Sequence, residues 1–71
     1  MSFRSNGPLK NRIAYYRKQR GMTQSDLGKF VGLTKASISK IETGFSGTTA
    51  YCAAKICLVL GVSFNDLFYF D

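Results

Sequence analysis

The 71-residue chain is too short for more than one domain, and its 45% hydrophobic and 20% charged residues are typical of a folded protein and not of a disordered tail. It has no His, and Cys52 and Cys57 lack the spacing of a zinc site or of a disulfide within one helix. We therefore expect no metal, no cofactor and two small apolar cysteines in a reducing cytoplasm. The longest apolar stretch, "ICLVL", is far too short to cross a bilayer, and "MSFRSNGP" is no signal peptide.

Charge is unevenly distributed along the chain. Ten Lys and Arg against four Asp and Glu give a net charge of +6. Residues 1–55 carry ten positive and two negative charges, hence +8, whereas residues 56–71 carry only two negative charges, hence −2. The basic part is either a nucleic-acid-binding surface or an ordinary solvated surface, and charge alone favours nucleic acid only modestly.

Five helices and no strand are predicted from apolar periodicity and from the residues that start and stop helices. Thr23, Thr34 and Ser63 stand at expected helix starts, and Asp26 and Asp66 follow two of them by three residues. Glycines 21, 32, 44 and 61 each follow an apolar run, as residues just past a helix end do. The predicted helices are 8–20 (with Pro8 in the first turn), 24–31, 35–43, 49–60 and 64–69.

The third predicted helix, within "GLTKASISKIETG", has a small and basic outer face. Ile38 and Ile41 share one side at 100° per residue, and the other side carries Lys35, Ala36, Ser39, Lys40 and Thr43. Small side chains let a helix backbone approach a surface closely, and two lysines suit an anionic groove with base edges. The short "GLT" connection from the second helix predicts a DNA-binding helix-turn-helix, although many helical hairpins with such turns bind nothing.

The segment "RKQRGMTQSDLGKFVGLTKASISKIETG", followed by "LGVSFNDLF", resembles the lambda-repressor-like (Cro and repressor type) helix-turn-helix family from about Leu9 to Phe68. The resemblance implies a compact all-α domain of five helices at residues 8–71, with the helix-turn-helix at 24–43 and a flexible arm at 1–7. It also implies a homodimeric transcriptional regulator, repressor or controller, that binds a palindromic operator in double-stranded DNA through the major groove.

The same resemblance assigns residue roles. The base-reading positions are Lys35, Ala36 and Lys40, with Ser39 either reading a base or filling space. The phosphate-binding positions are Gln24, Thr34, Ser37 and Thr43, and Arg12 adds a basic contact from the first helix. Gln24 would also brace the recognition helix, and Thr34 can serve as helix cap and phosphate ligand together. Arg4 in the arm either contacts DNA or lies in a frayed terminus.

The resemblance further implies a partly buried ion pair between Arg17 and Glu42 beneath the helix-turn-helix. With no His, and with carboxylates that look like helix caps or structural partners, no nucleophile and base can be paired, so we expect no enzymatic activity.

The C-terminal third is apolar and aromatic, which predicts an interface. Leu58, Phe68, Phe70 and, with less support, Tyr51 are expected to form a homodimer interface. The alternative is an antitoxin-type protein whose apolar C-terminal surface binds a toxin or another protein, with DNA binding secondary. A homodimer that covers the surface, or a stable monomer that exposes it, would discriminate between the two.

Overall fold

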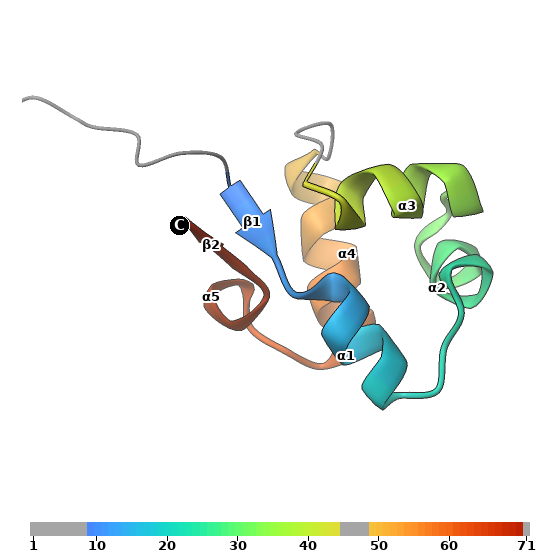
Figure 1. The fold of residues 1–71 in the computed structure, drawn as a ribbon, viewed down its shortest axis with the longest axis horizontal. Coiled ribbons are helices and arrows are strands. Elements are labelled where there is room, and N and C mark those ends of the chain that lie inside the picture. Colours follow the sequence, from blue (N-terminus) through green and yellow to red (C-terminus); the bar gives the residue numbers. More distant parts are fainter. Residues whose placement is uncertain (1–8, 45–48, 71) are drawn as a thin grey trace, which may run out of the picture.

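The computed structural model describes residues 9–44 and 49–70, and within them the chain forms five helices and one two-stranded antiparallel sheet (Figure 1). The helices are α1 (Ile13–Gln19), α2 (Gln24–Val31), α3 (Lys35–Glu42), α4 (Ala50–Leu60) and α5 (Phe64–Leu67), and the strands are β1 (Leu9–Asn11) and β2 (Phe68–Phe70). The expected helical fold is confirmed, with the small sheet as an addition. None of the described helices is both long enough and apolar enough to span a bilayer.

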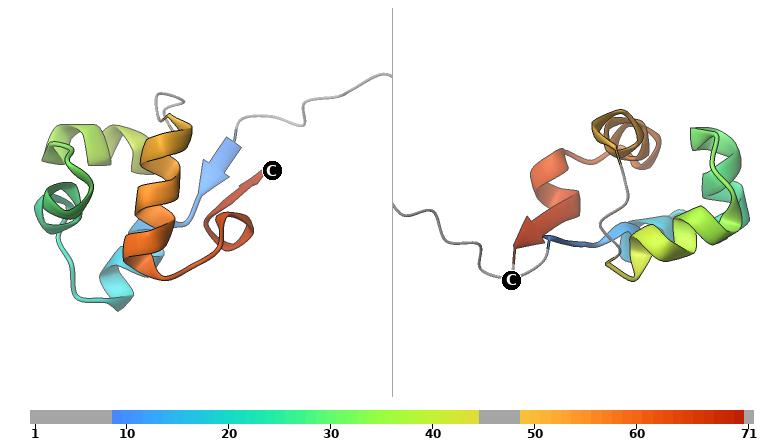
Figure 2. Two further views of the ribbon diagram at one scale, coloured as in Figure 1. Left: turned by 180° about the vertical axis from the view of Figure 1, so that it is seen from behind. Right: turned by 90° about the horizontal axis from the view of Figure 1, so that it is seen from above.

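The core gathers around α4, which crosses the middle of the molecule with α2 and α3 on one side and α5 and the strands on the other (Figure 2). Its fully buried large side chains come from every helix and are Ile13, Leu27, Ile38, Ile56, Leu60 and Leu67. Each such side chain stabilises the fold by about 1.5–3 kcal/mol relative to an exposed position. Because Ile38 is among them, α3 is fixed to the core by its apolar side.

The two ends of the described chain form β1 and β2, where the sequence predicted helix. Leu9 pairs with Phe70 and Asn11 with Phe68. Directly beyond the sheet, the Arg12 N–H donates to the Leu67 carbonyl oxygen at 2.7 Å. Aromatic side chains such as those of "FYF" favour strands. The first helix therefore begins at Ile13 and not at residue 8, the last ends at Leu67 and not at 69, and the prediction that no strand occurs is wrong.

The predicted helix starts and stops agree with the structure elsewhere. Thr23, Thr34 and Ser63 are N-caps whose hydroxyls accept backbone N–H groups, and Asp26 and Asp66 complete capping boxes. Helices α2, α3 and α4 begin and end within one residue of their predicted bounds. The predicted arm with Arg4, and the placement of Pro8, lie outside the described residues.

Candidate nucleic-acid interface

The turn between α2 and α3 depends on two glycines. Gly32 ends α2 with φ +76°, a left-handed conformation that L side chains rarely adopt. Gly28 is buried inside α2, where a β-carbon would press against the Leu33 carbonyl, and the Leu33 N–H donates to the Gly28 carbonyl oxygen at 2.8 Å. The prediction missed Gly28, although a glycine inside a helix is itself a signal of close packing. A larger residue at position 28 therefore cannot fit without moving the turn.

The N-terminus of α3 is held by hydroxyl groups. The Thr34 hydroxyl oxygen accepts from the Ser37 N–H at 3.1 Å and donates to the Ser37 hydroxyl at 3.0 Å. Ser37 is half-buried and Thr34 is exposed. The cap fixes the first turn of α3 and thereby holds the exposed Lys35 and Ala36 at a defined position on the surface.

The outer face of α3 carries the residues predicted to read bases. Lys35, Ala36 and Lys40 are exposed and Ser39 is half-buried, whereas Ile38 and Ile41 are in the core. Figure 1 shows α3 along one edge of the molecule, away from the connection between α1 and α2. Thr43 is exposed at the C-cap and its hydroxyl donates to the Lys40 carbonyl oxygen at 3.0 Å. The structure thus brings the predicted base-reading residues together on one outward face.

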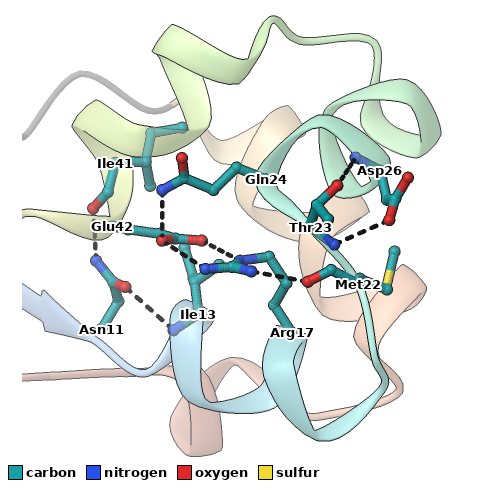
Figure 3. A network of polar contacts seen from close by, with 9 residues as sticks. All are labelled: Asn11, Ile13, Arg17, Met22, Thr23, Gln24, Asp26, Ile41 and Glu42. Atoms are coloured by element: carbon teal, nitrogen blue, oxygen red, sulfur yellow. Dashed lines mark hydrogen bonds and ion pairs between the residues drawn. The ribbon is translucent and has the colours of Figure 1, made fainter.

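The C-terminal end of α3 is fixed by a polar network centred on Glu42 (Figure 3). Arg17 Nε lies 2.7 Å from Glu42 Oε2 and Nη2 lies 3.3 Å from Oε1, while Nη1 donates to the Met22 carbonyl oxygen at 2.7 Å. The exposed fractions of the Arg17 and Glu42 side chains are 9% and 7%. The ion pair implied by the resemblance is therefore present, and both side chains are almost fully buried.

Gln24 belongs to the same network. Its Nε2 donates to Glu42 Oε1 at 2.9 Å, so the first residue of α2 is connected to the last residue of α3. This contact is the brace that the resemblance implied for Gln24. The second N–H of this half-buried amide is the donor that a phosphate could use.

Arg12 lies in a different setting from the one predicted. The sequence placed it inside the first helix, whereas it is the N-cap of α1 and its guanidinium lies 4.0 Å from the centre of the Tyr69 ring. Stacking on an aromatic face holds a guanidinium without neutralising it. Arg12 is exposed and remains available to an anion from this position beside β2.

An apolar face lies on α4 and α5. On these helices Leu58 is 82% exposed, Tyr51 69% and Phe64 51%, and Lys55 Nζ lies 5.2 Å from the centre of the Tyr51 ring. Phe70, on β2, is 65% exposed. Next to them is an open pocket of about 630 Å³ whose lining, between Ala50 and Phe64, contains no charged residue. Cys57 is in this lining, and partial burial raises the pKa of its thiol above the ordinary value. We call this surface the α4–α5 face.

Phe68 does not belong to the α4–α5 face, contrary to the prediction. It is 6% exposed, lies in the core, and stacks on Phe64 with 4.8 Å between ring centres. Phe68 and Phe70 lie on the same side of β2, because side chains two apart in a strand share a face. Phe68 directly follows α5 and reaches the core, whereas Phe70 pairs with the exposed Leu9 at the far end of the sheet and is 65% exposed. Of the four residues predicted for an interface, Leu58, Phe70 and Tyr51 are therefore the exposed ones.

The fold and the outward face of α3 together define a small helix-turn-helix DNA-binding domain. Residues 13–67 match the family model described as helix-turn-helix, and the chain belongs to this family of DNA-binding transcriptional regulators. An uncharacterized HTH-type transcriptional regulator of Methanocaldococcus jannaschii is 35% identical over 63 residues, which cover 89% of this chain and 96% of the relative. Within the described ranges, no group of three or more His, Cys, Asp or Glu side chains could hold a metal ion.

Solved structures agree with this assignment. The master regulator for biofilm formation SinR, in complex with DNA, superposes with a TM-score of 0.68 and 33% identity, over 76% of this chain and 87% of that one. SinR in a complex with SinI gives a TM-score of 0.69 at 33% identity over 76% of this chain, which spans 53% of that longer chain. The chain likewise spans 57% of ClgR from Corynebacterium glutamicum, which at 24% identity and a TM-score of 0.70 supports the fold alone.

Proposed function

We propose that the protein regulates transcription by binding a palindromic operator as a homodimer, with α3 of each copy in the major groove. The observation that carries the proposal is the outward face of α3, where Lys35, Ala36 and Lys40 are exposed on a helix held rigidly at both ends. Small side chains allow close approach, and each lysine can donate to guanine O6 or N7. The net charge of +6 favours association with the phosphate backbone.

Phosphate contacts would come from the ends of the helix-turn-helix. Gln24, Thr34, Ser37 and Thr43 lie at the termini of α2 and α3. Backbone N–H groups at the start of α3 add donors of the kind that bind anions. Phosphate contacts position the protein, whereas the α3 side chains specify the sequence.

Selection from a random duplex library with the wild-type protein tests the DNA-binding proposal. We expect an enriched palindrome; a library that returns none contradicts specific binding. Lys40→Ala should then lose about 1–3 kcal/mol and relax the preference at one or two base pairs. Lys18→Ala is the matched control, because it removes the same charge from an exposed site in the last turn of α1 and should leave the preference unchanged.

The homodimer proposal is supported by the α4–α5 face. A specific interface buries at least about 500 Å² on each partner, and an exposed aromatic residue can contribute up to about 150–250 Å². With Leu58, Tyr51, Phe64 and Phe70 exposed, this face has enough apolar area for a second copy. A two-fold pair could set the two α3 helices about 34 Å apart, which is one turn of B-DNA.

Sedimentation at micromolar protein concentration tests whether the protein forms a homodimer. The wild type should sediment at twice the chain mass of 7.9 kDa. Leu58→Asp should give folded monomers with most of the operator affinity lost, because a single half-site binds weakly. Tyr15→Asp is the control, an equal change at a 57% exposed aromatic residue of α1. A wild-type monomer that binds its operator tightly would contradict the dimer and assign the α4–α5 face to a protein partner, as in the antitoxin-type alternative.

A further inference from the structure

Asn11, the last residue of β1, contacts the ends of two helices (Figure 3). Its Oδ1 accepts from the N–H of Ile13, the first residue of α1, at 3.1 Å. Its Nδ2 donates to the carbonyl oxygen of Ile41, in the last turn of α3, at 2.7 Å. One side-chain amide therefore joins α1, α3 and the hairpin that closes the chain.

The bond from the Ile13 N–H satisfies a group that α1 leaves without a partner inside the helix, and the bond to the Ile41 carbonyl oxygen adds to the one that this oxygen accepts from the Gly44 N–H at 3.1 Å. The first N–H groups and the last C=O groups of a helix have no intrahelical partner. Arg12, the N-cap of α1, provides no side-chain cap, so Asn11 takes this role from one residue further out. The amide also has a favourable orientation, with its oxygen at the positive end of α1 and its nitrogen at the negative end of α3.

The bond to Ile41 differs in kind from the other contacts at the end of α3. Glu42 connects this end to α1 and α2 through Arg17 and Gln24, inside the helix-turn-helix. Asn11 connects it to β1, and β1 is paired with β2 directly after α5. A pocket of about 230 Å³ lined by Lys10, Asn11, Thr43 and Tyr69 lies between the hairpin and the end of α3. The hydrogen bond from Asn11 Nδ2 to the Ile41 carbonyl oxygen joins β1 to the end of α3 beside this pocket.

We propose that Asn11 is a positioning residue for DNA recognition, which fixes the C-terminal turn of α3 to the β1–β2 hairpin. The inference rests on the proposed reading of DNA by α3. Without the Nδ2 donor the last turn of α3 keeps its contacts to Arg17 and Gln24 but loses its link to β1. Lys40, one residue before Ile41, is then positioned only through the core packing of α3 and the contacts of Glu42, without the link to β1. The β1–β2 sheet therefore helps to position α3, in addition to pairing the two ends of the described chain.

Three substitutions separate positioning from capping. Asn11→Asp has the same shape and keeps the acceptor for the Ile13 N–H but loses the donor to Ile41. Asn11→Ser also keeps an acceptor and is too short to reach Ile41, without adding a charge. Asn11→Ala removes both bonds. Asn65→Asp, at an exposed position of α5, makes the same chemical change as Asn11→Asp elsewhere and is the matched control.

The first measurement is made on the free protein, so that it does not depend on DNA. In ¹H–¹⁵N spectra, Asn11→Asp and Asn11→Ser should shift the amide signals of residues 41–44, and Asn65→Asp should leave them in place. In the wild type, the Asn11 side-chain NH₂ should exchange slowly with solvent. If Asn11→Asp does not fold, Asn11→Ser decides the result. Unshifted signals in a folded donor-less variant would overturn the proposed link.

The second measurement compares operator affinity with melting temperature. We expect Asn11→Asp and Asn11→Ser to bind the selected operator about tenfold more weakly, the effect of one lost hydrogen bond, and to keep most of the melting temperature. A purely capping role predicts full affinity for both and a loss of stability in Asn11→Ala alone, and that pattern would refute positioning. If the wild type selects no operator, the proposed function fails, while the amide signals still decide whether the link exists.

Discussion

Removing the Glu42 carboxylate should strongly destabilise the domain. Glu42→Ala removes both contacts of the Arg17 guanidinium with the carboxylate. Arg17 keeps its charge, and of these partners only the Met22 carbonyl oxygen remains. It also removes the acceptor of Gln24. The Arg17 side chain is 9% exposed, so water can replace the lost carboxylate only in part.

The size of the effect follows from this burial. Breaking one side of a buried ion pair costs about 3–5 kcal/mol, because an uncompensated charge remains. A domain of this size has only about 3–5 kcal/mol of net stability. At about 4–8 °C per kcal/mol for a small domain, the melting temperature should fall by at least about 12 °C, and the variant can be unfolded at 37 °C.

Thermal and urea unfolding followed by circular dichroism measure this effect. Asp66→Asn is the control, since it also removes one negative charge but does so at an exposed helix cap and should cost far less. The double variant Arg17→Met with Glu42→Leu should be less destabilised than Glu42→Ala, because no unpaired charge remains. A Glu42→Ala protein that melts within about 3 °C of the wild type, less than 1 kcal/mol, would refute the reasoning.

Three further changes have defined outcomes. Gly28→Val should lower the melting temperature sharply, with a cost of about 2–3 kcal/mol, because its side chain must displace the Leu33 carbonyl. Hydrogen bonds from Thr23 lower the pKa of Asp26 below its ordinary value of 3.8. The stability that this carboxylate contributes is therefore present above pH 3.8 and is lost as the pH falls through the lower pKa of the folded state. Asp26→Ala should be less stable than the wild type at neutral pH, and the difference should vanish in strong acid. Leu58→Ala, at 82% exposure, should leave the unfolding of a monomer unchanged and reduce self-association in sedimentation.

Local chemistry was sufficient to predict most of the fold. Helix caps such as Thr34 and turn glycines such as Gly32 act over a few residues, and the structure has them where the sequence predicted. The apolar spacing of Ile38 and Ile41 gave the buried side of α3 for the same reason. The Arg17–Glu42 pair joins residues 25 positions apart and was predicted only through the family resemblance.

The β1–β2 pairing could not be predicted from local chemistry. Asn11 and Phe68 are paired across almost the whole chain, and three-residue strands carry too little alternation to be recognised. Once the strand was missed, Phe68 was assigned to the outside and Arg12 to the inside of a helix. The errors at the two ends of the chain therefore have one cause, a long-range pairing that overrides helix propensity at both ends.

The contacts around α3 explain how so small a domain can hold this helix, the proposed DNA-reading element, in a defined position. Its apolar side is buried through Ile38 and Ile41. Directional bonds act on both ends: Thr34 caps the first turn, and Glu42 and the Ile41 carbonyl are held in the last. The outward face carries Lys35, Ala36 and Lys40, which are exposed and not part of the buried core. If α3 reads DNA as proposed, substitutions of these exposed side chains can change the DNA sequence that is recognised without a change in the fold that presents them.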